Sequence, residues 1–497
     1  MPATYDPSAS YSQPVGLLYV FNLIVGTGAL ALPKAFQTAG WLLSFGILLV
    51  SAFMSYVAAT FIIEALSVAN AVSAKKRRRE QVTTEYDDIV VADVGPSSYE
   101  ITNKVEVSEM ASMFLSKSWL LVSYISLNVY LFGDLAIYST TVPKSAMNLI
   151  CATINATTVK RTDPCHPHWP LFFDRMTVYR ICVVAFILIC TPMIIVGITK
   201  TKYIQLTTTV SRWTAFILMI ALASAQLLSD GVAAHPPAAN FHGFGSLFGV
   251  TVYAFMCHHS LPALITPMRS KVNIFGMLWL VYSVVGFFYF TLSMTGAFAF
   301  LHVQDLYTLN FIHDKNTTFF YSVCDIFLAL FPVLTLTTNY PIVAITLTNN
   351  LKVVKDLIWP TNDTEHESLL ENNDDSDNDS VASHDSRLNR SDRNESSTST
   401  LILTFFVVVL PTFISLMTDD LLLLATITGS YPGVGVQFVV PCLLVIAARK
   451  YAKSVLNFPV PRKHASPFQS DFWPFVIALW AAFAIGMVSL NMFGVKF

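Results

Sequence analysis

Long apolar runs separated by short polar connections dominate the chain. Eleven of these runs approach the roughly 20 residues that a helix needs to cross a bilayer core about 30 Å thick. They cover residues 15–38, 42–70, 119–143, 178–198, 206–228, 245–266, 275–300, 319–347, 400–417, 421–447 and 473–493. Only Thr418, Asp419 and Asp420 separate the ninth run from the tenth, so this hairpin is the least distinct boundary. The pattern predicts an all-α polytopic membrane protein with about eleven transmembrane helices.

Two of the predicted spans are interrupted. The first contains Gly26, Gly28 and Pro33, and the sixth contains His258, His259, Ser260 and Pro262. In hydrocarbon, a broken backbone is tolerated only where it lines a cavity. Interruptions at corresponding positions of two halves are typical of inverted-repeat transporters, whose substrate site lies between the unwound segments. We therefore expect a five-plus-five inverted repeat of spans one to five and six to ten, followed by an additional eleventh span.

Composition supports this class and excludes others. Hydrophobic residues make up 54% of the 497 residues and charged residues 12%, which is far too apolar for a soluble chain of this size. The polar leader before residue 15 lacks a basic stretch, so the first span is expected to be retained and not cleaved as a signal. No basic patch with interleaved aromatics suggests nucleic acid. No metal-ligand spacing, phosphate loop or nucleophile with a base suggests an enzyme or a cofactor.

Lysine and arginine clusters predict the orientation. With a cytosolic N-terminal tail (1–14), the clusters at 75–79, 200–202, 269–271, 352–355 and 449–463 fall on one side, which the positive-inside rule makes cytosolic. Arg175 and Arg180 lie on the other side and count mildly against this assignment. The prediction is a transporter core at 15–447, cytosolic loops at 72–108, 349–399 and 448–472, a lumenal loop at 151–177, and an eleventh helix with a lumenal C-terminus at 473–497.

The predicted lumenal loops carry the features expected there. Asn155 and Asn316 begin glycosylation sequons, and Cys151 and Cys165 lie in the first of these loops. Sequons are used and disulfides persist on the lumenal side. Cys151 and Cys165 are therefore either a disulfide or two free thiols. The other five cysteines lie in apolar segments, where small buried side chains are expected.

The predicted cytosolic loops carry possible targeting signals. The segment 361–400 is acidic, rich in serine and asparagine, and expected to be disordered. Within the loops, Tyr86 to Ile89 is similar to a tyrosine-based sorting signal and Glu365 to Leu370 to an acidic dileucine signal. Both would be read by coat adaptors and would suit an endolysosomal or plasma membrane. The alternative is that such short patterns arise by chance in solvated acidic loops.

A family resemblance rests on the two interrupted spans. The residues that carry it are Asn22, Gly26-Thr27-Gly28, Leu32-Pro33 and Phe36 to Gly40 in the first span, and Phe255 to His258 with Leu261-Pro262 in the sixth. These elements resemble the amino acid/auxin permease family, especially its sodium-coupled neutral amino acid transporter branch. The resemblance implies the five-plus-five fold, related to the APC superfamily, and transport of an amino acid. It does not identify the substrate.

An α-amino acid presents a carboxylate and an ammonium, and broken helices offer partners for both. We expect the backbone N–H groups of Gly26, Thr27 and Gly28 to bind the carboxylate. Carbonyls around Ala254, Phe255 and Cys257 would take the ammonium, with His258 beside them. A bulky β-branched residue at Gly26 or Gly28 is expected to abolish binding without unfolding the protein. The alternative is that the glycines only allow close helix packing and that Phe255 is simply packed.

Candidate coupling groups lie in spans one, three and eight. In related transporters a sodium ion lies between carbonyls of span one and oxygens of span eight. Here the candidates are Asn22 in span one and Thr335, Thr337, Thr338 and Asn339 in span eight, since hard cations prefer oxygen ligands. The alternative is that the threonines bond to their own helix.

Asp134 is a carboxylate inside span three, where intramembrane acids often mark proton relays. The structural alternative is a hydrogen bond that locks spans three and eight. His258 and His259 titrate near physiological pH when unperturbed, and at most one of them should face the site.

The sequence thus predicts a secondary active transporter of a small amino acid or similar zwitterion, coupled to sodium or protons and working by alternating access. The alternative function is a membrane receptor that senses an amino acid without transporting it. Such a receptor would signal through the loops 72–108 and 349–399, which are long enough to be more than connections.

Overall fold

The computed structural model describes residues 11–84, 95–151, 162–166, 169–170, 172–196, 202–312, 319–359 and 388–492. This part of the chain is almost entirely helical, and its only β-type pairings are two isolated bridges, Tyr11 with Met268 and Pro164 with Asp174. Within these residues, ten helices are long and apolar enough to cross a membrane, and a bent pair of shorter helices raises the number to eleven. The predicted all-α polytopic architecture is confirmed.

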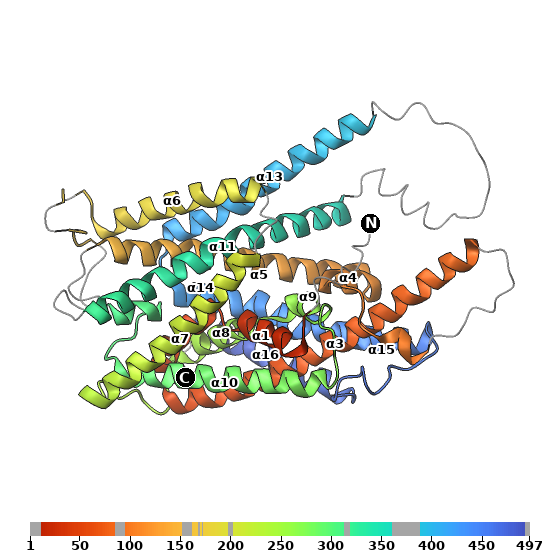
Figure 1. Ribbon diagram of the computed structural model, residues 1–497, viewed down its shortest axis with the longest axis horizontal. Helices are drawn as coiled ribbons and strands as arrows, with labels where there is room; N and C mark the ends of the chain where they lie inside the picture. Colours follow the sequence, from red (N-terminus) through yellow and green to blue (C-terminus); the bar gives the residue numbers. More distant parts are fainter. Residues whose placement is uncertain are drawn as a thin grey trace.

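Most spans are single helices that lie side by side along the long axis of the molecule (Figure 1). They are α3 (Trp41–Thr84), α5 (Lys117–Ile150), α6 (Arg175–Val196), α7 (Lys202–Asp230), α10 (Ile274–Ala299), α11 (Phe319–Ile358), α13 (Leu388–Met417) and α16 (Phe472–Met492). The hairpin at Thr418 to Asp420 separates two distinct spans, because α13 ends at Met417 and Asp420 caps the next helix through its side chain.

Both predicted interruptions are present. Span one consists of α1 (Gln13–Ile24) and α2 (Thr27–Ala39), which meet at an angle of 52°. Span six consists of α8 (Phe244–Ala254), the short η4 turn (His258–Ser260) and α9 (Leu261–Ile265). α1 and α8 lie in the middle of the bundle (Figure 1). The irregular backbone is therefore surrounded by protein, as hydrocarbon requires.

A third irregular span was not predicted. Span ten contains α14 (Leu421–Thr428), the π-helical segments η6 (Gly429–Gly433) and η7 (Gly435–Val439), and α15 (Val440–Ser454). A Cβ at Gly429 would collide with the carbonyl oxygen of Gly249 in α8. Glycine therefore allows span ten to approach the first half of span six at backbone distance.

The connections are more helical than the sequence suggested. α3 continues to Thr84, and η2 (Pro96–Tyr99) and α4 (Val107–Phe114) follow, so much of 72–108 is not loop. The expected disorder up to residue 400 is wrong in its last part, because α13 begins at Leu388. Extending an existing helix costs far less free energy than nucleating a new one, so the helix of an apolar span can continue into polar sequence. The motifs Tyr86 to Ile89 and Glu365 to Leu370 lie outside the described residues.

A buried ion pair joins two spans near the predicted cytosolic face. Glu64 in α3 is 1% exposed and receives two hydrogen bonds of 2.8 Å from Arg449 in α15. The backbone N–H of Ser466 donates a third bond of 2.9 Å. A buried carboxylate needs such partners to offset its lost hydration. The pair therefore fixes span ten against span two and anchors the segment that follows α15.

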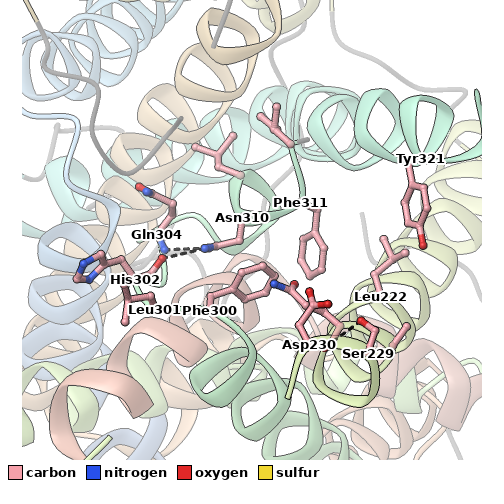
Figure 2. Close-up of a pocket in the computed structure, with 14 residues that line it drawn as sticks. Leu222, Ser229, Asp230, Phe300, Leu301, His302, Gln304, Asn310, Phe311 and Tyr321 are labelled. Carbon is pink, nitrogen blue, oxygen red and sulfur yellow. Dashed lines mark hydrogen bonds between the residues drawn. The ribbon is translucent and has the colours of Figure 1, made fainter. Parts of the chain in front are cut away.

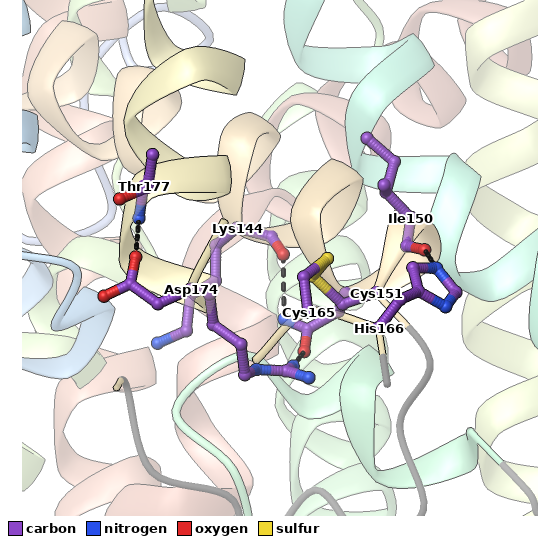
Figure 3. The surroundings of a disulfide bond; sticks show 9 residues. Lys144, Ile150, Cys151, Cys165, His166, Asp174 and Thr177 are labelled. Carbon is purple, nitrogen blue, oxygen red and sulfur yellow. Dashed lines mark hydrogen bonds between the residues drawn. A yellow bond between two sulfur atoms is a disulfide. The ribbon is translucent and has the colours of Figure 1, made fainter. Parts of the chain in front are cut away.

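On the predicted lumenal side, the structure joins Cys151 to Cys165, with 4.6 Å between their Cα atoms (Figure 3). The bridge links the end of α5 to the segment before α6. There the Thr177 side chain and the Thr177 N–H, the latter across 2.7 Å, both hydrogen-bond to the carboxylate of Asp174, and these bonds hold the pKa of Asp174 below its usual range. The sequons at Asn155 and Asn316 lie outside the described residues.

Candidate functional site

The two helix breaks meet at the hydroxyl of Tyr289 in α10. This hydroxyl lies 2.8 Å from the carbonyl oxygen of Ile24, the last residue of α1, and 2.9 Å from that of Ala254, the last residue of α8. Each carbonyl lies in the last turn of its helix, where no following turn supplies an N–H group to it. A tyrosine has one O–H, so it can donate fully to only one of the two carbonyls at a time. The pair of carbonyls therefore has capacity for a further donor.

The first turn of α2 faces the same break. Gly26 is its N-cap, and among the described residues no side chain caps the N–H groups of this turn. A Cβ at Gly26 would meet no atom closer than 4.0 Å, whereas a Cβ at Gly28 would lie 2.6 Å from the Cα of Ala254. Gly26 therefore borders open space, and Gly28 is required for close packing of α2 on α8. Gly28 is therefore a packing glycine, as the alternative interpretation held. A bulky residue at Gly28 would disturb the fold, so the expectation that it would abolish binding without unfolding the protein is wrong for this position.

A chain of hydrogen bonds connects spans one, six and three. The hydroxyls of Thr27 and Tyr253 are 2.9 Å apart, and Tyr253 donates to the carboxylate of Asp134 across 2.7 Å. All three residues are buried, with at most 8% of their surface exposed. The expected structural alternative, a bond from Asp134 to span eight, is wrong about the partner, because Asp134 reaches α8 in span six.

The segment between α8 and α9 is packed tightly. Phe255 is fully buried, with its ring centroid 5.3 Å from that of Tyr289. The Cys257 sulfur lies 3.1 Å from the hydroxyl of Tyr282. Phe255 is therefore a packed side chain in this structure, which agrees with the alternative interpretation given in the sequence analysis.

The two histidines of span six point to different helices. His258 Nε2 lies 2.9 Å from the carbonyl oxygen of Ser55 in α3, whereas the ring of His259 lies 5.7 Å from that of Tyr130 in α5. Tyr130 is one helical turn from Asp134. His259 therefore contacts the tyrosine that precedes Asp134 by one turn. The Nδ1 atoms of both rings are buried without a partner in the described structure.

The last turn of α1 is bound to α7. The side-chain nitrogen of Asn22 donates to the Thr209 hydroxyl across 3.0 Å, and the guanidinium of Arg212 donates to the Asn22 backbone carbonyl. The amide oxygen of Asn22 is buried and has no partner among the described residues. The oxygen-rich region expected to hold a sodium ion thus already contains a cationic side chain.

The candidate ion ligands in span eight differ in their burial and hydrogen bonding. Thr335 is 2% exposed and its hydroxyl has no partner in the described structure, whereas Thr338 bonds back to the carbonyl oxygens of Leu334 and Thr335. Thr337 and Asn339 are half-buried. Among these four candidates, Thr335 is the one that offers a free buried hydroxyl.

A separate network lies on the predicted lumenal side. Lys144 in α5 pairs with Asp305 at 2.7 Å and donates to the carbonyl oxygen of Asp419 at 2.8 Å, while Asp305 accepts from the N–H of Leu421. These bonds join span three, the segment before α11 and the start of α14. They hold these three elements together.

A pocket of about 590 Å³ lies between the end of α7, the segment 300–312 and the start of α11 (Figure 2). The Asn310 side chain bonds to two backbone groups of this segment: it accepts from the N–H of Gln304 and donates to the carbonyl oxygen of His302. None of the site residues expected from the sequence lines this pocket. It is therefore distinct from the helix breaks.

Comparisons with known proteins agree with this architecture. A family model described as transmembrane amino acid transporter protein matches residues 11–487. The Caenorhabditis elegans protein named transmembrane protein 104 homolog is 67% identical over 99% of this chain and 98% of its own length. Human transmembrane protein 104 is 39% identical over 97% and 96% of the two chains. The resemblance noted in the sequence is confirmed.

Among solved structures, MhsT in complex with L-phenylalanine aligns with a TM-score of 0.50 and 12% identity. The alignment covers 97% of this chain and 99% of MhsT. At this identity the likeness concerns the fold alone. It supports the five-plus-five class expected from the paired interruptions.

Proposed function

Because the chain belongs to the transmembrane amino acid transporter protein family, we propose that it is a secondary active transporter of a small α-amino acid, driven by protons. The observation that carries this proposal is the meeting of the Ile24 and Ala254 carbonyls at the Tyr289 hydroxyl. Two helix-end carbonyls directed at one point form an acceptor pair for an ammonium group, which has three donors and a full positive charge.

The carboxylate of the substrate would bind at the start of α2. The N–H groups of its first turn have no side-chain cap, and the helix dipole favours negative charge there. Gly26 contributes the open space beside it, since a Cβ added at this position would meet no atom closer than 4.0 Å. The two ends of a zwitterion would thus be held by backbone of both repeats, and inverted-repeat transporters place their substrate at this interface.

Asp134 is the group that would carry the coupled proton. The titratable groups around it are Tyr253 from α8, Tyr130 and Tyr138 from α5, and His259 beyond Tyr130. Within the described residues no cation pairs directly with Asp134, so its charged form lacks the partner that a buried carboxylate needs. Protonation removes that charge, and the bond through Tyr253 to Thr27 links its state to the first turn of α2.

Binding and flux together test this function. Purified protein would be screened against the amino acids by thermal unfolding at two pH values, because a ligand that binds only the folded state raises the melting temperature. The ligand found would then be offered to proteoliposomes under a proton gradient. We expect accumulation with an inward proton gradient and none without a gradient. Binding without accumulation under proton or sodium gradients would instead support the receptor function.

A matched pair of glycine variants makes the screen specific. Gly26→Val places a branched side chain at the start of α2, whereas Gly46→Val changes a glycine of α3 that also has open space around its Cβ direction. The proposal predicts loss of ligand stabilisation in the first variant and normal stabilisation in the second. Equal stabilisation in both would place the ligand elsewhere.

A further inference from the structure

Arg212 lies inside span five, in the first half of α7, and directs its charge at the broken span one. Its Nη1 donates to the backbone carbonyl of Asn22, one of the last carbonyls of α1. Such carbonyls have no intrahelical partner and form the negative end of the helix dipole. The guanidinium therefore sits where a cation is electrostatically favoured.

The neighbouring atoms are those that a hard metal cation would use. The Asn22 amide oxygen is buried without a partner in the described structure, and the Thr209 hydroxyl lies 3.0 Å from the Asn22 side-chain nitrogen. Thr209 and Arg212 are three residues apart on α7, so they share a face of that helix. Neutral oxygens of this kind suit sodium, but the cation that they adjoin here is the guanidinium.

One side of Arg212 is lined by tightly packed aromatic rings. The Phe21 ring stacks on Trp213 with centroids 4.3 Å apart, and Phe288 lies edge-on to both Phe21 and Phe216. The narrow crevice lined by these side chains, Asn22, Val25 and Arg212 has no volume that would admit a water molecule. In such low-dielectric surroundings a second cation would be strongly repelled by the guanidinium. Within the described residues no carboxylate pairs with Arg212 to screen it.

We propose that the Arg212 guanidinium is a built-in cation that occupies the position of a coupling sodium ion at the end of α1, so that the protein works without sodium. The inference rests on the proposed function, which it deepens by excluding one of the two candidate coupling ions. The fixed charge stabilises the break permanently. Coupling must then come from a group that can change its charge, as Asp134 can.

A sodium titration of the purified protein tests this inference directly. Thermal unfolding would be followed as sodium replaces N-methylglucamine at constant ionic strength. For the unaltered protein we expect no saturable shift. Arg212→Gln removes the charge and leaves oxygen ligands, so its melting temperature should start lower and rise saturably with sodium. Arg212→Lys keeps a cation and should remain insensitive to sodium.

Arg180→Gln is the matched control, since it removes an exposed arginine of α6 and should respond like the unaltered protein. A saturable sodium shift in the unaltered protein would overturn the inference, and this result does not depend on whether a variant folds. An Arg212→Gln protein that folds but ignores sodium would overturn it as well.

Uptake separates this inference from the proposed function. With a proton gradient, replacing all sodium by N-methylglucamine should change the uptake rate less than about twofold, and a requirement for sodium would contradict the inference. If no amino acid is taken up under any gradient, the transporter function fails. The sodium titration would still report on Arg212 in that case.

Discussion

Tyr253 donates a hydrogen bond of 2.7 Å to the carboxylate of Asp134, and this contact ties the interrupted sixth span to the third. Because Tyr253 also contacts Thr27 at the start of α2, the protonation state of one carboxylate is linked to both broken spans. Protonation of this carboxylate can therefore affect, through these hydrogen bonds, the backbone that would bind the substrate.

The first prediction concerns Asp134→Asn. The amide keeps an oxygen for Tyr253 but cannot change its charge, so uptake should lose its stimulation by an inward proton gradient while ligand affinity at a fixed pH changes little. The melting temperature at neutral pH should be equal or higher, because a buried charge without a cationic partner is removed. Proton-gradient uptake and thermal unfolding measure the two effects. Undiminished proton stimulation in this variant would show that the proton binds elsewhere.

A second prediction concerns Tyr289→Phe. Loss of the hydroxyl leaves the carbonyls of Ile24 and Ala254 buried without their donor, which should destabilise the ligand-free protein by about 1–3 kcal/mol. An ammonium group that binds these carbonyls would restore the lost bonds. The rise in melting temperature on adding ligand should therefore be larger in this variant than in the unaltered protein. An unchanged rise would mean that the ligand does not use these carbonyls.

The two glycines of the first break should respond differently to alanine. At Gly28, a methyl group would lie 2.6 Å from the Cα of Ala254, a backbone atom that cannot rotate away. Gly28→Ala should therefore lower the melting temperature, whereas Gly26→Ala should fold normally and weaken ligand binding. Expression, thermal unfolding and ligand titration distinguish the two. Normal stability of Gly28→Ala would contradict the close contact of α2 and α8.

The disulfide should contribute to the stability of the protein and not to ligand binding. Cys151 and Cys165 are 14 residues apart, a loop whose closure stabilises a folded chain by about 3 kcal/mol in the chain-entropy model. The double change to serine should lower the melting temperature and leave the ligand affinity unchanged, because the bridge lies outside the helix breaks. Reduction of the unaltered protein should have the same effect. A large loss of affinity would indicate that the segment closed by the bridge shapes the site.

The breaks were predictable from the sequence because their cause is local. Gly26, Gly28 and the His258 to Pro262 segment disrupt apolar helices in ways that composition reveals directly. The irregular tenth span was missed, although its Gly429 to Gly433 segment carries two glycines and a proline. The residue that Gly429 approaches at backbone distance, Gly249, belongs to another span, so this contact has no local signature in the sequence.

Three central side chains escaped the sequence analysis for a similar reason. Tyr253 lies near the end of α8 and Tyr289 inside the continuous helix α10, and both are common residues of apolar helices. Only the packing of α8 and α10 shows that their hydroxyls face the breaks. Arg212 carried a usable signal, since an arginine inside a predicted span is costly unless it faces the bundle interior. Its partner, a backbone carbonyl of α1, has no signature in the sequence at all.

The most direct test of the account is a structure of the protein with its amino acid bound. We predict the ligand carboxylate within hydrogen-bond distance of the N–H groups at Gly26, Thr27 and Gly28. Its ammonium should lie at the carbonyl oxygens of Ile24 and Ala254. A ligand bound instead in the pocket beside Asp230 and His302, or away from both helix breaks, would contradict the central claim that these breaks form the substrate site.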